Sequence, residues 1–111
     1  MLARRNRIPS SFFPTREKPR DRATSPFFTV RVWDGKTPAN RFAVIVSRKV
    51  AKTAVLRNRI RRIIYSLIHQ NKFDVREDCY DVVIIAQKGI THATTQEIAE
   101  HLVKTLNKIF Q

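Results

Sequence analysis

The sequence predicts a small α+β domain, a two-layer sandwich in which helices pack on one side of a β-sheet. Residues 27–33 alternate apolar and polar side chains, as a half-exposed strand does. Two further runs, RFAVIVS at 41–47 and YDVVIIA at 80–86, are apolar enough to be buried strands. Two segments, 53–70 and 94–109, repeat apolar residues every three or four positions, which is typical of amphipathic helices.

The 111 residues allow a single domain, residues 1–111, whose N-terminal part is the least regular. Residues 1–9 are predicted to be a flexible basic arm. A short helix is expected around Phe13, which two serines can cap and two prolines limit. Residues 20–25 are polar and are predicted to form a loop.

In the first predicted strand, alternate residues face opposite sides of the sheet. One side carries Phe28, Val30 and Val32, and the other carries Phe27, Thr29, Arg31 and Trp33. The strand at 41–47 is apolar on both faces, which predicts a central position in the sheet. With a further short strand expected around residues 37–40, the order of elements is α-β-β-β-α-β-α.

The basic helix at 53–70 lies between two predicted strands and therefore suggests a β-α-β unit. Helices would then cover one face of the sheet and leave the other partly open. The residues TTQE at 94–97 form a capping box for the last helix. The open face would carry aromatic and cationic groups suited to single-stranded nucleic acid, namely Phe27, Thr29, Arg31, Trp33, Ala43 and Ser47.

The charge distribution points to a polyanionic partner. The formal net charge is +13, and residues 1–62 hold 17 basic and 3 acidic side chains, against 5 basic and 6 acidic in residues 63–111. Residues 48–62 contain seven Lys or Arg and no acid. No apolar run exceeds five residues and the N-terminus does not read as a secretory signal, so we expect a cytoplasmic protein without a membrane-spanning helix.

Nothing in the sequence forms a self-contained active site. The three histidines lack metal-site spacing, two glycines cannot build a phosphate-binding loop, and one cysteine excludes an intramolecular disulfide. Four acids ahead of the last strand are best interpreted as a solvated loop, namely Asp74, Glu77, Asp78 and Asp81. The chain therefore reads as a binding protein with no catalytic or metal-ligating residues of its own.

An ordered set of motifs resembles the bacterial ribonuclease P protein component. Its centre is FAVIVSRKV at 42–50 followed by AVLRNRIRR at 54–62, which contains the Arg-Asn-Arg signature of that family at 57–59. The resemblance extends to Asn-Arg-Ile at 6–8, SPFF at 25–28 and the strand at 80–86. It covers nearly the whole chain in order.

This resemblance implies a fold and a function. Members of the family form an α/β sandwich with a left-handed β-α-β crossover. Their protein joins a catalytic RNA, ribonuclease P RNA, in an endonuclease that removes the 5′ leader from precursor tRNA. Catalysis is carried by the RNA, which also holds most of the Mg²⁺, so the protein alone is expected to be inactive. We expect no membrane partner and no DNA partner.

The resemblance also implies two groups of site residues. The catalytic RNA would be contacted by a loop and the helix that follows it, through Arg48, Lys49, Lys52, Arg57, Asn58, Arg59, Arg61 and Arg62. The precursor-tRNA leader would lie in a cleft between the first helix and the sheet, against Phe13, Thr29, Arg31 and Ser47. Many family members have aromatic residues at the positions of Glu17 and Arg31, so leader contacts here would depend more on charge.

Two other interpretations remain open on the residues alone. A generic, ribosome-associated RNA-binding module would explain the charge and the fold equally well. A DNA-binding protein that places the basic helix in the major groove fits less well, because the segment before that helix reads as a strand and not as a first helix of a helix-turn-helix.

Overall fold

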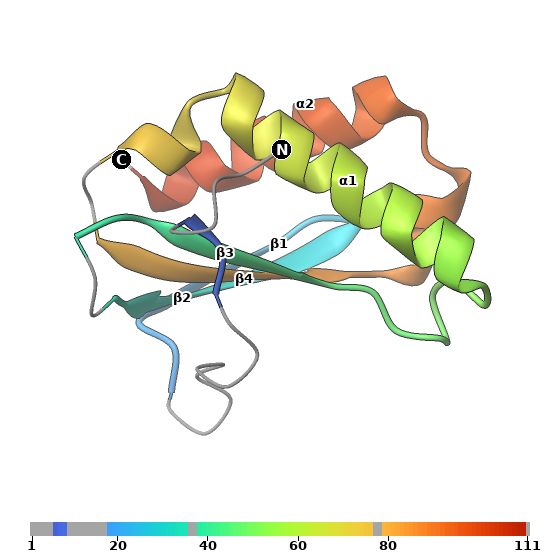
Figure 1. The fold of residues 1–111 in the computed structure, drawn as a ribbon, viewed down its shortest axis with the longest axis horizontal. Helices are drawn as coiled ribbons and strands as arrows, with labels where there is room; N and C mark the ends of the chain where they lie inside the picture. The colour runs from blue at the N-terminus through green and yellow to red at the C-terminus, as the bar shows by residue number, and fades with distance from the viewer. Residues whose placement is uncertain (1–5, 9–17, 36–37, 77–78, 111) are drawn as a thin grey trace.

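The computed structural model describes residues 6–8, 18–35, 38–76 and 79–110, and shows a four-stranded sheet with two helices on one face (Figure 1). The strands and helices are, in chain order, β1 (Asp21–Thr24), β2 (Phe28–Asp34), β3 (Arg41–Ile45), α1 (Ala54–Gln70), β4 (Tyr80–Ala86) and α2 (Thr95–Ile109). Two short 3₁₀-helices, η3 (Phe73–Val75) and η4 (Lys88–His92), flank β4. The predicted two-layer α+β architecture is confirmed.

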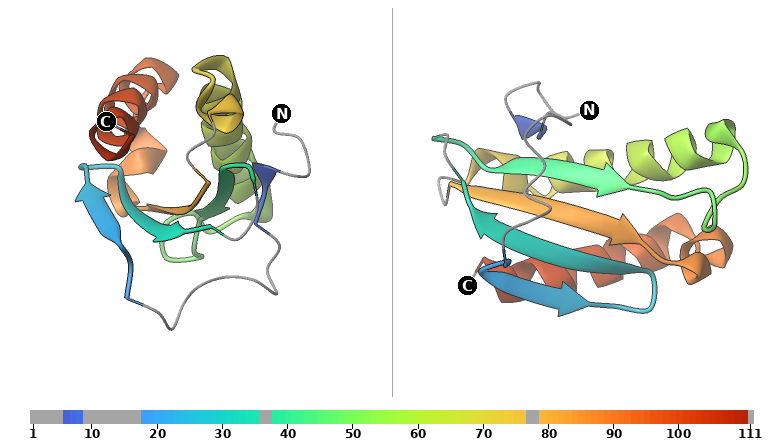
Figure 2. Two further views of the ribbon diagram at one scale, coloured as in Figure 1. Left: turned by 90° about the vertical axis from the view of Figure 1, so that its left-hand side faces the viewer. Right: turned by 90° about the horizontal axis from the view of Figure 1, so that it is seen from below.

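The strands lie in the order β1-β2-β4-β3, with β2 antiparallel to both neighbours and β3 parallel to β4. Helix α1 connects the two parallel strands, as the sequence predicted. In the right-hand view of Figure 2, both strands point right, β4 lies below β3 and α1 lies behind the sheet. This arrangement is a left-handed crossover, whereas almost all parallel connections are right-handed.

The main core fills the space between the sheet and the two helices. Strand β2 contributes Phe28 and Val30, each with no exposed surface, and β4 contributes Val82 and Ile84 beside them. The predicted stripe of α1 faces these strands, with Ile60, Ile64, Leu67 and Ile68 buried. Helix α2 adds Ile98, Leu102, Leu106 and Ile109. The 3.6-residue periodicity therefore identified the packed side of both helices.

Strand β3 lies at the edge of the sheet, so the prediction of a central position is wrong. The central strand on that side is β4, which separates β3 from β2. The outer edge of β3 is covered by the chain itself, because Arg7 forms a bridge with Phe42 and the Ile8 N–H donates to the Phe42 carbonyl at 2.9 Å. The apolar pattern of β3 indicates that both faces of the strand are covered. It does not indicate where the strand lies in the sheet.

The predicted loop at 20–25 contains a strand instead. All four residues of β1 pair with β2, from Asp21 opposite Val32 to Thr24 opposite Thr29. Of these four side chains only Ala23 packs against the core. The segment is therefore an exposed edge strand whose sequence carries no apolar alternation. The further strand expected around 37–40 is absent from residues 38–40, and the helix expected around Phe13 lies outside the described residues.

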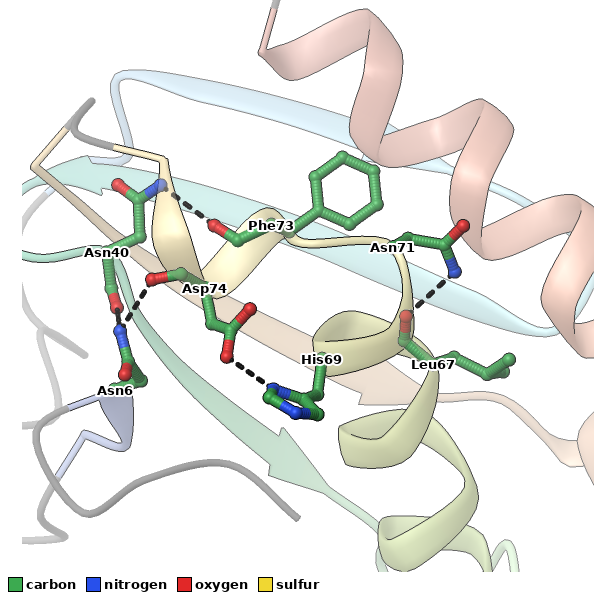
Figure 3. A network of polar contacts seen from close by, with 7 residues as sticks. All are labelled: Asn6, Asn40, Leu67, His69, Asn71, Phe73 and Asp74. Carbon is green, nitrogen blue, oxygen red and sulfur yellow. Dashed lines mark hydrogen bonds and ion pairs between the residues drawn. The ribbon is translucent and has the colours of Figure 1, made fainter.

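Within the predicted flexible arm the structure describes residues 6–8, of which Asn6 and Ile8 are buried and Arg7 is exposed. The Asn6 side chain is 3% exposed, and its Nδ2 donates to the backbone carbonyls of Asn40 at 2.9 Å and Asp74 at 2.8 Å (Figure 3). Asn40 in turn donates from Nδ2 to the Phe73 carbonyl at 3.2 Å and accepts from the Tyr80 N–H at 2.8 Å. These bonds join the N-terminal segment to three distant parts of the chain.

Candidate nucleic-acid interface

The basic part of the molecule is a loop, residues 47–53, and the start of α1. The loop turns tightly, because the Ser47 carbonyl accepts from both the Val50 and the Ala51 N–H groups at 3.1 and 3.0 Å. Ala51 is buried and anchors the loop, which leaves Arg48, Lys49 and Lys52 exposed. We call this loop together with residues 54–62 the basic surface.

Helix α1 begins at a typical N-terminal cap. The Thr53 hydroxyl accepts from the Leu56 N–H at 3.2 Å, and the first turn contains no acidic residue. The first N–H groups of a helix carry a partial positive charge, which here adds to the charge of the surrounding side chains. Both contributions favour an anion at this end of α1.

The members of the Arg-Asn-Arg signature have different roles within the structure. Arg57 is half-buried, and its Nη1 donates to the backbone carbonyls of Ala51 at 3.0 Å and Lys52 at 3.1 Å, so it ties the loop to the helix. The Asn58 amide oxygen accepts from Nη1 of Arg61 at 2.6 Å. Arg59 is exposed and forms no hydrogen bond or ion pair with any residue that the structure describes.

The charge of the basic surface is not neutralised by acids of the described residues. Their salt bridges lie elsewhere and join Arg20 to Asp34, Arg41 to Asp81 and His69 to Asp74. Like Arg59, the exposed Arg62 takes part in none of them. Unpaired guanidinium groups at this density repel one another, and phosphate groups would relieve that repulsion.

The sheet face opposite the helices is organised in rows that cross the strands. One row runs from Thr29 of β2 through Ile85 of β4 to Ile45 of β3, and the next runs from Arg31 through Val83 to Ala43. Arg31 is exposed and Thr29 is half-buried, while the Thr29 hydroxyl accepts from Nε2 of Gln87 at 2.9 Å. We call this surface the open sheet face.

Part of the open sheet face is covered by the chain itself. Trp33, Ala43 and Val83 are buried in a second apolar cluster with Ile8, so Trp33 is not available for stacking on a base. Phe27 was predicted on this face, and that prediction is wrong. Its ring packs against the main core and meets the His101 ring edge-on, with 4.9 Å between the centroids.

The two predicted groups of site residues lie at the same end of the sheet. Thr29 stands at the start of β2 and Ile45 ends β3, and both share a row with Ile85. Ser47 follows two residues after Ile45, is exposed and opens the loop of the basic surface. The open sheet face and the basic surface are therefore contiguous near Ser47. Phe13 lies outside the described residues.

One cation on the open sheet face was missed by the sequence analysis. Arg22 of β1 lies directly opposite Arg31 and is exposed beside it. The pairing could not be foreseen, because residues 20–25 had been predicted to form a loop. The two guanidinium groups extend the positive charge across the edge of the sheet.

Of the four acids predicted to form a solvated loop, the two that the structure describes are buried, and Asp74 precedes β4 whereas Asp81 lies within it. Asp74 is buried, and its Oδ2 lies 2.8 Å from Nδ1 of His69 at the end of α1 (Figure 3). Asp81 is also buried and holds Arg41 with two hydrogen bonds of 2.9 and 2.8 Å. The hydrogen bonds that Arg41 donates to the Asp81 carboxylate raise the pKa of Arg41 above its usual value. Among the described residues, no group of three His, Cys, Asp or Glu side chains is placed to hold a metal ion.

No helix in the described part of the chain is long and apolar enough to cross a membrane.

The comparisons with known proteins agree on one family. A family model described as Ribonuclease P matches residues 3–110. The ribonuclease P protein component of Bacillus mycoides is 29% identical over 109 residues, which cover 96% of this chain and 93% of that protein. That of Pseudoalteromonas translucida is 32% identical over 88 residues, or 79% of this chain, and the match spans 61% of its length. The match to the ribonuclease P protein component of Pelotomaculum thermopropionicum spans 59% of that protein's length.

Solved structures agree with the sequence comparisons. The Staphylococcus aureus RNase P protein superposes with a TM-score of 0.71 at 27% identity, covering 80% of each chain. The Thermotoga maritima RNase P protein has a TM-score of 0.70 at 22% identity, covering 79% of this chain and 82% of that one, and supports the fold. The match of the family model over almost every residue decides the assignment: the chain belongs to the ribonuclease P protein family.

Proposed function

We propose that this protein is the protein subunit of ribonuclease P and promotes the endonucleolytic removal of the 5′ leader from precursor tRNA. Family membership supports the reaction. The contiguity of the basic surface with the open sheet face supports simultaneous binding of the catalytic RNA and its substrate. Two RNAs meet at the reaction, the catalytic RNA and its substrate. A protein with two adjoining RNA-binding surfaces can hold both at once.

The basic surface binds the catalytic RNA. Its exposed cations would release condensed counterions from RNA phosphates, which is the main source of affinity in such contacts. Arg57 acts by holding the loop that carries Arg48, Lys49 and Lys52, and Arg61 acts by orienting the Asn58 amide. Arg59 and Arg62 are the residues that contact phosphate directly.

The open sheet face binds the leader as an extended single strand. Thr29 and Arg31 present a hydroxyl and a guanidinium group from neighbouring rows of β2, and Ser47 lies at the end of β3. The described cations here outnumber the exposed aromatic rings, so charge and hydrogen bonding carry the contact more than stacking. Phe13 would complete this site from the N-terminal segment, whose start is fixed by the buried Asn6.

The catalytic RNA would hold most of the Mg²⁺, which would supply activation of the attacking water. The buried carboxylates of the described chain are used by Arg41 and His69, and the basic surface offers no acid to a cation. The protein contributes by attracting both RNAs and fixing the leader near the reacting phosphate, which lowers the Mg²⁺ concentration that the reaction needs. We expect cytoplasmic localisation and no membrane or DNA partner.

The test is cleavage of precursor tRNA at limiting Mg²⁺ by the catalytic RNA from the same genome, with and without the protein. We expect the protein to restore cleavage at the 5′ end of the mature tRNA and to cut nothing when the catalytic RNA is omitted. Cleavage by the protein alone would contradict the proposal.

A generic RNA-binding module makes a different prediction in the same assay. It would bind precursor and mature tRNA equally, because nothing in its function requires a leader. We expect the complex of protein and catalytic RNA to bind precursor tRNA more tightly, and to lose that preference when Arg31→Ala removes a cation from the open sheet face. A matched control is Lys108→Ala, which removes an exposed cation from the far end of α2.

A further inference from the structure

We propose that the outer groove between α1 and α2 receives an unpaired nucleotide of the catalytic RNA. This inference rests on the proposed function, because it names a second contact with the same partner. The two helices lie side by side on the sheet (Figure 2), and residues of both helices line the groove. It begins where the basic surface ends, at Arg59 and Arg62.

The groove has the size and the chemistry of a ligand site. It is an open hollow of about 480 Å³, a volume within the usual range for small-molecule pockets. Ile63 and Leu67 of α1 form an apolar floor, since both are wholly or partly buried against the core. Ser66 and Gln70 of α1 and Thr95 of α2 supply hydroxyl and amide groups around that floor.

Charge selects the occupant. Arg59 and Arg62 stand on one side of the groove and form no ion pair within the described chain. The start of α2 lies on the other side, where the Glu97 carboxylate of the capping box offsets the partial positive charge of the helix N-terminus, so the attraction for an anion comes from the two arginines. The nearest acid of that first turn, Glu97, accepts from the Thr94 N–H at 3.0 Å and completes the capping box.

The position of the site along the groove also follows from charge. Beyond Leu67 and Gln70 the hollow between the helices continues past Glu100 and Lys104, whose charges balance, so this part has no net attraction for a nucleic acid. The end beside the two arginines is therefore the end that suits a polyanion. An apolar peptide would gain nothing from the arginines.

The combination of an apolar floor, flanking guanidinium groups and small polar groups favours an unpaired base over a duplex. A duplex presents its backbone and buries its base faces, so it would contact the arginines and leave the floor empty. An unpaired base can pack on the floor and stack on a guanidinium plane, while its edge reaches the hydroxyl and amide groups.

Thiol protection tests occupancy directly. Ser66→Cys places a thiol in the groove, and Gln96→Cys places one on the exposed surface of α2, next to Thr95 but outside the groove lining. Each full-length variant is alkylated with iodoacetamide with and without saturating catalytic RNA, and peptide mass spectrometry separates these thiols from Cys79. We expect the RNA to slow alkylation at position 66 by about tenfold when about nine-tenths of the protein is bound, and to leave position 96 largely reactive. Equal protection at both positions, or none at position 66, overturns the proposal.

A neutral obstruction provides the second test. Ser66→Leu fills the groove without changing charge, and Gln96→Leu is the control on the neighbouring helix. Since a stacked base contributes a substantial part of single-strand affinity, Ser66→Leu should weaken binding of the catalytic RNA roughly tenfold to hundredfold. Gln96→Leu should leave it unchanged, and thermal unfolding should show both variants folded.

The two proposals fail in different ways. If the unmodified protein does not bind the catalytic RNA, the proposed function is wrong. If the unmodified protein binds and Ser66→Leu binds equally well, the proposed function stands and the groove proposal is wrong.

Discussion

Two arginines of the same signature should respond differently when each is replaced by alanine. The Arg57 guanidinium donates to two backbone carbonyls of the loop at 3.0 and 3.1 Å, and the side chain is half-buried. Arg59 is exposed and bonds to nothing in the described chain. Arg57→Ala should therefore reduce the stability of the protein, whereas Arg59→Ala should reduce only its affinity for RNA.

The size of the stability effect follows from the two hydrogen bonds. A hydrogen bond from a charged donor contributes about 1.5–3 kcal/mol when it is well buried, and partial exposure reduces this to about 1 kcal/mol or less. Arg57→Ala should then lower the free energy of unfolding by about 1–2 kcal/mol. In a domain of this size each kcal/mol lowers Tm by about 4 °C. Arg59→Ala should change stability by less than about 0.5 kcal/mol.

The size of the binding effect follows from counterion release. Each lost phosphate contact lowers the slope of log K against log salt by about 0.7–0.9, which corresponds to a roughly four- to fivefold loss of affinity at ~0.15 M salt. Arg59→Ala should show this loss. The double variant with Arg62→Ala should lose roughly 20-fold if the two contacts are independent.

The assay pairs thermal unfolding with titration of the catalytic RNA across a salt series, on the same preparation of each variant. Arg57→Lys is a useful third variant, because it keeps the charge while its shorter side chain does not reach the position of the Arg57 Nη1 that donates to both carbonyls. If Arg59→Ala unfolds as early as Arg57→Ala, or if its salt slope equals that of the unmodified protein, the division of roles argued from the structure is wrong.

Three further predictions concern stability, each measured by thermal or denaturant unfolding. Asn6→Ala should cost about 2–3 kcal/mol, because two buried carbonyls lose their donor, and a loss below about 0.5 kcal/mol would show that residues 6–8 contribute little. Asp81→Ala should cost about 3 kcal/mol because the half-buried Arg41 loses the two hydrogen bonds that it donates to this carboxylate, and adding Arg41→Met should recover part of that loss; no recovery would argue against the pair. Hydrogen bonds from Thr94 lower the pKa of Glu97, so its contribution is complete above its ordinary value of 4.5 and is lost as pH falls through the lowered pKa. The Tm difference between the unmodified protein and Glu97→Gln should accordingly shrink from pH 7 to about pH 2, and a constant difference would contradict this assignment.

Sequence patterns identified the parts of the fold whose periodicity reflects burial. The stripe of α1, the strand β4 and the capping box at Thr94 all appear as predicted, since each depends on neighbours within a few residues. The place of each strand in the sheet depends on distant pairing. For this reason β3 was assigned to the centre and β1 was missed, although the residues of both are visible in the sequence.

The candidate site also combines features that depend on nearby residues with features that depend on distant contacts. A dense run of cations is a local feature, and the exposure of Arg48, Lys49 and Arg59 follows from it. The bonds that tie Arg57 to the loop and the burial of Trp33 under Ile8 depend on the folded chain. The groove between α1 and α2 has no sequence signal, because its two sides come from separate helices.

The most direct test of the central claim is the rate of precursor-tRNA cleavage by the catalytic RNA from the same genome at limiting Mg²⁺, measured with the protein, with its Arg59→Ala/Arg62→Ala variant, and without protein. Two adjoining RNA-binding surfaces predict rapid cleavage at the 5′ end of the mature tRNA with the unmodified protein. The variant should need a higher protein concentration for the same rate, and the RNA alone should cleave slowly. Equal rates with and without the protein would contradict the claim that this chain serves ribonuclease P.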